Sequence, residues 1–488
     1  MMVAILEVLD STIVNVALPS MMGTLGANVE EITWVLTSYI VSSAIFIPLT
    51  GFIERNIGRK NLLLINVSGF MVSSALCGMS TNLSAMIIFR ILQGIFGAAL
   101  IPLSQAILRD TFPLEEQGKA MAIWGIGILT APVLGPALGG FIVENFNWRF
   151  IFYMNLPFCF LGIFLILLVI QDTQRKPQKI DWLGMGLMAI GIGGLQLMLD
   201  RGNQYNWFES DFIISLLLIS IISLTFFIWR GSKISNNVVK LEIFLNRNFS
   251  LATILLFAFC ALLFAEIVLQ PMMLQELFGY SSLTAGWTMA PRGFASMVTM
   301  SLSPLLMKRY GIKVQLLMGL LLDAYGTYLM TNYNLNASMW VIVWPTIIQG
   351  LGMGLFFVPL STVALATLSK EDSAEAAGLF SYGRMVGSAV GISLVSTYLS
   401  RLEQVNWQRL GGHIHQFNPA LYHWLSETGL KLYDPHAIQR LGDIVYRQAK
   451  MIAYLDVYWA IAMAFLILLP LVFLLKSVKL TSESMSFH

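Results

Sequence analysis

The chain has 488 residues, of which 57% are hydrophobic and only 11% are charged, and its formal net charge is +2. A typical soluble domain has about 25% charged residues, so this chain cannot cover itself with polar surface. The small net charge gives no reason to expect a nucleic-acid partner, and the three cysteines lie in apolar runs without a Cys-x-x-Cys spacing. Neither a disulfide framework nor a metal site is therefore favoured.

Apolar runs long enough to cross a bilayer, roughly 18 residues or more, follow one another along the whole sequence. Charged residues and Gly, Pro or Asn breaks separate them into fourteen expected transmembrane helices. The expected ranges are 2–22, 34–53, 61–79, 85–107, 120–142, 150–170, 182–199, 212–229, 249–275, 284–307, 314–331, 339–362, 377–400 and 452–475. The sequence thus predicts an all-α polytopic membrane protein.

Lys and Arg residues gather in alternate connections, which the positive-inside rule assigns to the cytoplasm. With the N-terminus inside, the short outer loops hold only Arg149 and Arg201, while the long outer segment 401–450 holds several more basic residues. An odd number of spans would break this alternation. Both termini are therefore predicted to be cytoplasmic.

Three pairs of segments repeat at offsets of 252 to 256 residues: 92–104 with 348–361, 135–139 with 387–391, and Gly58 with Gly311. The offset corresponds to a shift of eight helices in the same orientation. Parallel halves of this kind are the major facilitator arrangement, with the substrate site near the midplane between them. The predicted organisation is an N-terminal six-helix bundle (1–171), two inserted helices with their flanking loops (172–247) and a C-terminal six-helix bundle (248–488) that includes the external loop 401–450.

Five motifs are distributed over nearly the whole chain. They are LDSTIVNVALP at 9–19, GFIERNIGRK at 51–60, RILQGIFG at 90–97, GILTAPVLGPALGG at 127–140, and WRFIFYMNLP at 148–157 with LDRG at 199–202 and Trp207. Together they resemble the motifs of the fourteen-span EmrB/QacA type of drug:proton antiporter. The resemblance implies proton-driven export without a cofactor, and it implies a periplasmic adaptor and an outer-membrane channel as partners.

The loop motif departs from the pattern of the family that it resembles. Its residues, which the resemblance assigns to a cytoplasmic gate, are Gly51, Glu54, Arg55, Gly58, Arg59 and Lys60. The Asp that is usual in the family falls on Arg55, and the Arg that follows it falls on Asn56. The gating salt bridge of the family therefore cannot be carried over, and Glu54 is the candidate substitute.

The fifth span carries the motif typical of facilitator antiporters and gives the strongest indication of export. Its motif residues are Gly127, Pro132, Gly135, Pro136, Gly139 and Gly140. The small residues form a stripe that lets another helix approach closely, and the prolines bend the helix. A similar stripe at Gly383, Gly387 and Gly391 indicates helix packing.

Charged residues inside the membrane are costly and therefore functional candidates. Asp10, Glu7, Arg90 and Glu266 are predicted to couple transport to protons, because a carboxyl group can take up a proton on one side and release it on the other as its surroundings change. The candidates for cavity residues or charge partners are Asn15, Gln93, Arg292, Asp323 and Arg384. Glu266 could instead form a structural bridge with Arg292 or Arg384.

The sequence thus predicts proton-coupled multidrug efflux across a bacterial inner membrane. The alternative is the same mechanism with an endogenous metabolite, a siderophore or a lipid-like compound as cargo. A non-transporting sensor is disfavoured because no soluble signalling domain is present, and no nucleotide loop, metal cluster or nucleophile motif indicates an enzyme. The segment 401–450 holds four histidines, at 413, 415, 423 and 436. It is interpreted as a solvated loop with partial amphipathic helices and as a candidate docking surface, rather than as a metal or pH-sensing site.

Overall fold

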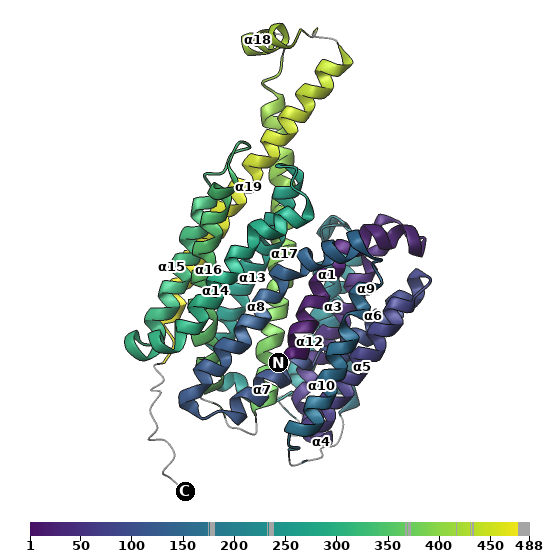
Figure 1. Cartoon of the computed structure of the whole chain (residues 1–488), viewed down its shortest axis with the longest axis vertical. Helices are drawn as coiled ribbons and strands as arrows, with labels where there is room; N and C mark the ends of the chain where they lie inside the picture. The colour runs from purple at the N-terminus through teal and green to yellow at the C-terminus, as the bar shows by residue number, and fades with distance from the viewer. Residues whose placement is uncertain are drawn as a thin grey trace.

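The computed structural model describes residues 1–173, 175, 181–231, 233, 239–366, 368, 372–415, 417–429, 431 and 434–476. These residues fold into helices, and no strand occurs among them. The long helices run side by side in one bundle (Figure 1).

The sequence repeat predicts two halves and an inserted pair of helices in this bundle, and the helices are grouped accordingly. The first half comprises α1 (Met2–Leu25), α2 (Val29–Ile32), α3 (Trp34–Phe46), η1 (Ile47–Leu49), α4 (Thr50–Ile57), α5 (Arg59–Met79), α6 (Leu83–Gly97), α7 (Leu100–Thr111), α8 (Leu114–Asn145), α9 (Phe150–Tyr153) and α10 (Asn155–Val169). The inserted pair is α11 (Trp182–Arg201) and α12 (Asp211–Gly231), with η2 (Trp207–Glu209) between them. The second half comprises η3 (Leu241–Leu245), α13 (Arg247–Glu276), α14 (Ser282–Tyr310), α15 (Ile312–Met330), α16 (Met339–Ala366), α17 (Ser373–Gly411), α18 (Pro419–Thr428) and α19 (Pro435–Phe473).

Among the described residues, eleven segments are long and apolar enough to cross a membrane. Three predicted spans are absent from these eleven, and they correspond to α8, α14 and α15, which have 32, 29 and 19 residues. The all-helical membrane fold is therefore confirmed. The count of fourteen spans stays a prediction.

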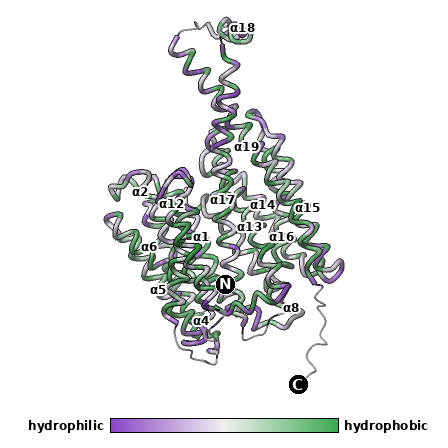
Figure 2. The backbone as a smooth tube through the Cα atoms, turned by 180° about the vertical axis from the view of Figure 1, so that it is seen from behind, coloured by the Kyte–Doolittle hydropathy of each residue, from purple (hydrophilic) through white to green (hydrophobic). Residues whose placement is uncertain are grey.

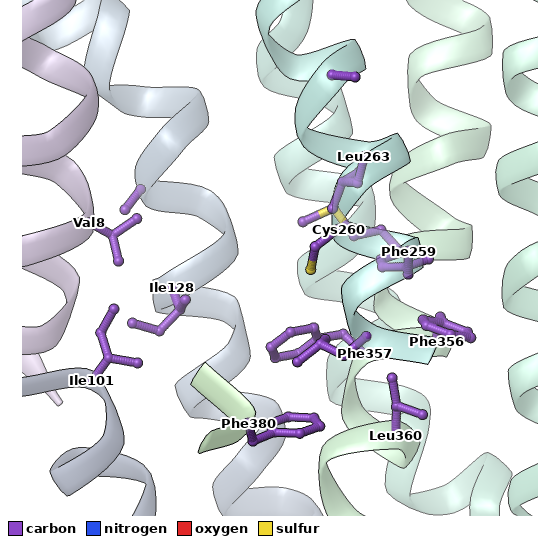
Figure 3. Close-up of a cluster of buried hydrophobic side chains, with 14 of the residues drawn as sticks. Val8, Ile101, Ile128, Phe259, Cys260, Leu263, Phe356, Phe357, Leu360 and Phe380 are labelled. Carbon is purple, nitrogen blue, oxygen red and sulfur yellow. The ribbon is translucent and has the colours of Figure 1, made fainter. Parts of the chain in front are cut away.

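The two halves meet along several helices. α8 of the first half packs along α14 and α16 of the second, and α4 and α7 pack against α17. In the interior, Val8 and Ile128 of the first half lie across from Phe357 and Phe380 of the second (Figure 3). The inserted helix α11 packs on α3 and on α17, so it contacts both halves.

The repeated glycines have the same backbone conformation. Gly58, before α5, has φ 88° and ψ 152°, and Gly311, before α15, has φ 82° and ψ 160°. A positive φ is costly for residues with a Cβ atom, so both turns favour glycine. The equivalence that the repeat predicts is thus visible in the local geometry.

The outer segment is more helical than a solvated loop. α17 continues to Gly411 and α19 begins at Pro435, so both helices project beyond the bundle and carry α18 at the tip (Figure 1). Polar residues are frequent along this projection (Figure 2). No Gly or Pro interrupts the sequence between Ile392 and Leu410, and Pro435 stands at the first helical position, where proline is favoured.

Candidate functional site

A cavity of about 520 Å³ lies between the two halves. α1, α3 and α7 line it from the first half, α13 and α17 line it from the second, and α11 adds a wall from the inserted pair. Most of the lining is apolar, and its charged residues are Glu7, Asp200 and Arg384. A cavity of this kind suits an amphipathic small molecule.

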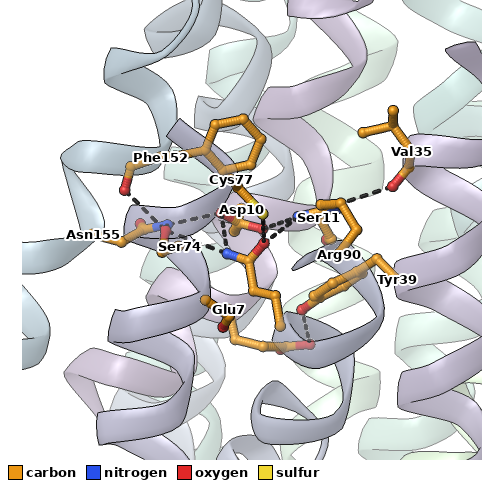
Figure 4. Close-up of polar contacts among 12 residues, drawn as sticks. Glu7, Asp10, Ser11, Val35, Tyr39, Ser74, Cys77, Arg90, Phe152 and Asn155 are labelled. Atoms are coloured by element: carbon orange, nitrogen blue, oxygen red, sulfur yellow. Dashed lines mark hydrogen bonds and ion pairs between the residues drawn. The ribbon is translucent and has the colours of Figure 1, made fainter. Parts of the chain in front are cut away.

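Asp10 lies behind the cavity wall and is fully buried. Its Oδ2 accepts a hydrogen bond from Arg90 at 2.7 Å, and its Oδ1 accepts from Asn155 at 2.7 Å and from Gln93 at 3.1 Å (Figure 4). Every one of these donors is an N–H group. The arrangement therefore satisfies an ionised carboxylate, which only accepts hydrogen bonds.

Arg90 is also fully buried and joins three helices. Besides its ion pair with Asp10 on α1, it donates to the carbonyl of Val35 on α3 at 3.0 Å and to Gln93 on its own helix at 2.8 Å. Its guanidinium lies 4.2 Å from the ring centroid of Tyr39. A buried guanidinium needs such partners because it cannot readily lose its proton.

Glu7 connects this cluster to the cavity. It lies one turn before Asp10 on α1 and lines the cavity, and the Tyr39 hydroxyl donates to its Oε1 at 3.0 Å. The ring of Tyr39 also stacks with Arg90, so Glu7 and the Asp10–Arg90 pair share one neighbour. Asn15 lines the same cavity but has no contact with this cluster among the hydrogen bonds of the described residues.

Glu266 belongs to a second buried cluster, in the other half. Its Oε2 accepts from Gln349 at 2.8 Å, and Thr327 Oγ1 lies 2.6 Å from its Oε1. Arg292 donates to Gln270 at 2.7 Å and to Gln349. In the described part of the chain, neither Arg292 nor Arg384 forms an ion pair with Glu266. Asp323 is buried beside this cluster and does not line the cavity.

The antiporter motif positions the helix that carries Glu7 and Asp10. On α8, a Cβ at Gly127 would collide with Ile5, one at Gly135 with Thr12 and one at Gly139 with Ile13, all on α1. Gly140 faces open space instead. The side chains of Pro132 and Pro136 lie outside the described residues.

An ion pair joins the two halves at the end of the bundle that carries α4. Arg55 pairs with Glu375 in the first turn of α17, and a Cβ at Gly51 would meet Glu375 at 2.6 Å. Glu54 pairs within its own half with Arg59, at 2.6 Å, and Arg59 also reaches Asp110 at 2.8 Å. The contact between the halves therefore has its basic residue in the loop motif.

The other two residues of the loop motif hold the start of α5. A Cβ at Gly58 would meet the Asp172 carboxylate, and the Lys60 ammonium donates to the carbonyl of Leu167 at 3.0 Å. These contacts stay within the first half.

The end of α11 contributes residues that sequence reasoning did not select. Thr37 donates to Asp200, and Arg201 lies 4.2 Å from the ring centroid of Trp34. On the other side, the Trp207 indole donates to Thr397 on α17 at 2.7 Å. The motif at 199–202 with Trp207 marks this region in the sequence, but the sequence does not show which helices the motif contacts.

Two helical halves around a central cavity define a membrane transporter rather than an enzyme. Residues 1–401 match the family model described as Major Facilitator Superfamily. The chain is 34% identical to the multidrug export protein EmrB of Escherichia coli (strain K12), over 96% of this chain and 93% of that protein. It is 35% identical to the fatty acid resistance protein FarB of Neisseria gonorrhoeae, over 96% of this chain and 94% of that protein.

Solved structures show the same fold. The human organic anion transporter MFSD10 has a TM-score of 0.62 at 16% identity, with 97% of each chain covered. The proton:xylose symporter XylE also has a TM-score of 0.62, at 13% identity, with 98% of this chain and 95% of that chain covered. The chain belongs to the Major Facilitator Superfamily and, within it, to the EmrB-type drug transporters. It is an integral membrane protein.

Proposed function

We propose that this transporter exports hydrophobic or amphipathic drugs across a bacterial inner membrane in exchange for protons, by alternating access and without a cofactor. The main observation in support of the proposal is the position of the Asp10–Arg90 ion pair directly behind the cavity wall. Val8 and Ser11 line the cavity, and Asp10 lies between them on α1 with its side chain in the ion pair behind the wall. The relatives named as multidrug export proteins support drugs as cargo.

The ion pair offers a physical route from proton uptake to a change in the cavity. Ionised Asp10 holds Arg90, and Arg90 ties α1 to α6 and α3. Protonation removes the negative charge, and a buried guanidinium without a counter-charge is strongly unfavourable. Arg90 must then find other acceptors, so the packing of α1 changes. Because α1 is also a cavity wall, proton uptake and substrate binding act on the same helix.

The closed end of the bundle fits one state of the transport cycle. With both termini in the cytoplasm, the Arg55–Glu375 pair closes the cytoplasmic end. The cavity lining extends past the opposite end of α11 to Asn203 and Gln204. Alternating access then requires the Arg55–Glu375 pair to break when the cavity opens to the cytoplasm.

Ethidium uptake into inverted membrane vesicles with an imposed pH gradient tests proton coupling. Wild-type vesicles should take up the dye, and an uncoupler should abolish the uptake. Asp10→Asn should remove uptake at unchanged membrane abundance. Uptake that continues unchanged in the presence of the uncoupler would refute proton coupling.

A second candidate cargo is an amphipathic anion, which includes the endogenous metabolites, siderophores and lipid-like compounds of the alternative hypothesis. Arg384 lines the cavity, and no carboxylate of the described residues forms an ion pair with it. A substrate carboxylate would supply that partner, since guanidinium groups bind carboxylates well. The relative named fatty acid resistance protein supports this candidate.

Arg384→Gln should then weaken laurate export much more than ethidium export. Equal losses of laurate and ethidium export would exclude a direct role of Arg384 in anion binding.

We propose the projection of α17, α18 and α19 as the docking surface for a periplasmic adaptor, which would connect the transporter to an outer-membrane channel. Trp407, Phe417 and Tyr422 are exposed there, and aromatic residues are frequent in interface cores. Site-specific photo-crosslinking from position 422 in intact cells should capture an adaptor. Crosslinks to lipid alone would argue against docking at this tip.

A further inference from the structure

The buried cluster of the second half repeats the cluster of the first. The equivalent pairs are Asp10 with Glu266, Gln93 with Gln349 and Ser74 with Thr327, at offsets of 256, 256 and 253 residues. These offsets agree with those of the sequence repeat. Each half therefore holds a carboxyl group, a glutamine amide and a hydroxyl group at corresponding positions.

The glutamine of each cluster also makes the same contacts. In the first half, the glutamine amide nitrogen lies 3.1 Å from the carboxylate and 3.4 Å from the hydroxyl oxygen. In the second half, both distances are 2.8 Å. In each half, the glutamine oxygen accepts from the arginine of the cluster. The second cluster is thus an organised polar site.

The hydrogen-bond pattern around Glu266 suits a protonated carboxyl group. Thr327 Oγ1 lies 2.6 Å from Glu266 Oε1 and 2.8 Å from the carbonyl oxygen of Asp323, and it accepts from Gln349. A hydroxyl group has a single hydrogen to donate. If that hydrogen goes to the Asp323 carbonyl, a protonated Glu266 completes the set by donating to Thr327. Asp10 has no such contact, since its neighbours are N–H donors.

Among the residues that the structure describes, Gln349 bridges Arg292 and Glu266. Arg292 donates to the Gln349 oxygen, and the Gln349 nitrogen donates to Glu266. An ionised Glu266 would draw Arg292 toward it, and a neutral Glu266 would release it. Proton loss and gain at Glu266 can therefore change the contacts of α13 with α14 and α16.

Glu266 has the same relation to the cavity as Asp10. Phe264, Ile267 and Val268 of α13 line the cavity, while Glu266 is buried behind them with 1% of its surface exposed. Both carboxyl groups thus lie behind residues that line the cavity. The other ionisable groups that face Glu266 from neighbouring elements are Arg292 on α14, Asp323 on α15, Tyr333 after α15 and Tyr458 on α19.

We infer that Glu266, supported by Thr327, Gln349 and Arg292, is a second proton-binding site, so that each transport cycle exchanges two protons, one in each half. The inference rests on the proposed proton-coupled export. It assigns a role in proton coupling to the second half. The number of protons exchanged in each cycle then does not depend on which compound is exported.

The proton count can be read from ethidium accumulation in proteoliposomes with the membrane potential clamped at zero. At equilibrium, exchange of two protons gives about 100-fold accumulation per pH unit, and exchange of one gives about tenfold. Wild type should show the steeper dependence, and Glu266→Gln, which keeps the shape of the side chain, should show the shallower one. Glu242→Gln, the same change at an exposed position outside the cluster, is the matched control and should behave as wild type.

The outcomes separate this inference from the function on which it rests. Wild-type transport that does not depend on the pH gradient would overturn both the second proton-binding site and the proposed proton-coupled export. A tenfold dependence in wild type that Asp10→Asn abolishes and Glu266→Gln leaves unchanged would overturn only the second site. A tenfold dependence in Glu266→Gln beside a 100-fold dependence in wild type would support it.

Infrared spectroscopy tests the same site without a transported probe. A pH titration of the reconstituted full chain should show a carboxylic acid band that shifts when glutamate alone is labelled with ¹³C. Glu266→Gln should remove this band, while Glu7→Gln and Asp323→Asn should leave it in place. Because Glu7 is also a buried glutamate, the comparison is repeated with Glu7→Gln as the background. A glutamate band that Glu266→Gln does not diminish in that background would contradict proton binding at Glu266.

Discussion

The two halves of the transporter contain equivalent buried clusters with different charge arrangements. In the first half, the arginine is on the same helix as the glutamine, three residues before it, and contacts the carboxylate at 2.7 Å. In the second half, the arginine is on a neighbouring helix, α14, and reaches the carboxyl group through the glutamine. One repeat thus holds a closed ion pair, and the other holds an arginine separated from its acid. The same fold thus surrounds two equivalent acids with different charge partners.

The sharpest test of this comparison is the loss of each arginine. Arg90→Gln leaves ionised Asp10 buried without its counter-charge, which should cost about 3–5 kcal/mol of stability and abolish coupled uptake. Arg292→Gln should cost less, about 1–3 kcal/mol, because its visible partners are amide oxygens. Melting temperatures of the purified variants and dye uptake would measure both effects.

A double variant serves as the control for this prediction. Asp10→Asn combined with Arg90→Gln should recover much of the stability lost in Arg90→Gln but no coupled transport. Equal destabilisation by the two single arginine variants would contradict the proposed difference between the halves.

The Arg55–Glu375 pair, which joins the two halves, should give the next largest effect. Arg55→Glu places two acids together and should lower the uptake rate about tenfold, equivalent to roughly 1.4 kcal/mol. Exchange of both charges, Arg55→Glu with Glu375→Arg, should restore most of the rate. Lys60→Glu changes a nearby charge whose contacts stay within the first half, so it should have little effect. If uptake by the variant with both charges exchanged is as slow as uptake by Arg55→Glu, the ion pair does not close this end of the bundle.

The glycine stripes of the two halves should differ in their tolerance of alanine. Gly139 and Gly391 are repeat equivalents, but a Cβ at Gly139 would first meet the Ile13 side chain, at 2.8 Å, whereas one at Gly391 would collide with the Ala261 carbonyl. A side chain can adjust more easily than a backbone group. Gly391→Ala should therefore cost about 1–3 kcal/mol of stability, more than Gly139→Ala. Gly140→Ala, which faces open space, is the control and should be neutral in the melting temperature.

The sequence singles out the intramembrane acids and Arg90 because a charge in lipid must find a partner. Asp10, Arg90 and Gln93 stand in motifs, and the structure brings them together. Asn155 and Glu375 were not selected as site residues. Asn155 reaches Asp10 from α10, and Glu375 lies just before the expected span 377–400.

The expected helix 284–307 is present as α14 (Ser282–Tyr310), although it is not among the eleven segments that are apolar enough to cross a membrane. α14 contains Pro291, Pro304 and Arg292, so its apolar character is low although it forms one continuous helix. One side of α14 packs against α8 and α16, and tertiary packing can maintain a helix that contains such residues. Pairing between distant helices, such as Arg55 with Glu375, depends on the whole fold and cannot be read from spacing along the chain.

The smallest effect should come from an ion pair at one end of the inserted pair, between Asp181, which precedes α11, and Arg230 in the last turn of α12. Arg230 donates to Asp181 at 2.8 Å and holds the pKa of that carboxyl below its usual value. A lowered pKa adds stability above the unfolded value, about 3.9, and that stability is lost as pH falls through the folded pKa. Asp181→Asn should therefore cost at most about 1 kcal/mol at neutral pH, and its melting temperature should approach that of wild type below pH 4. A difference that stays constant down to low pH would contradict a contribution from the Asp181 charge, because asparagine can still accept the hydrogen bond from Gly184.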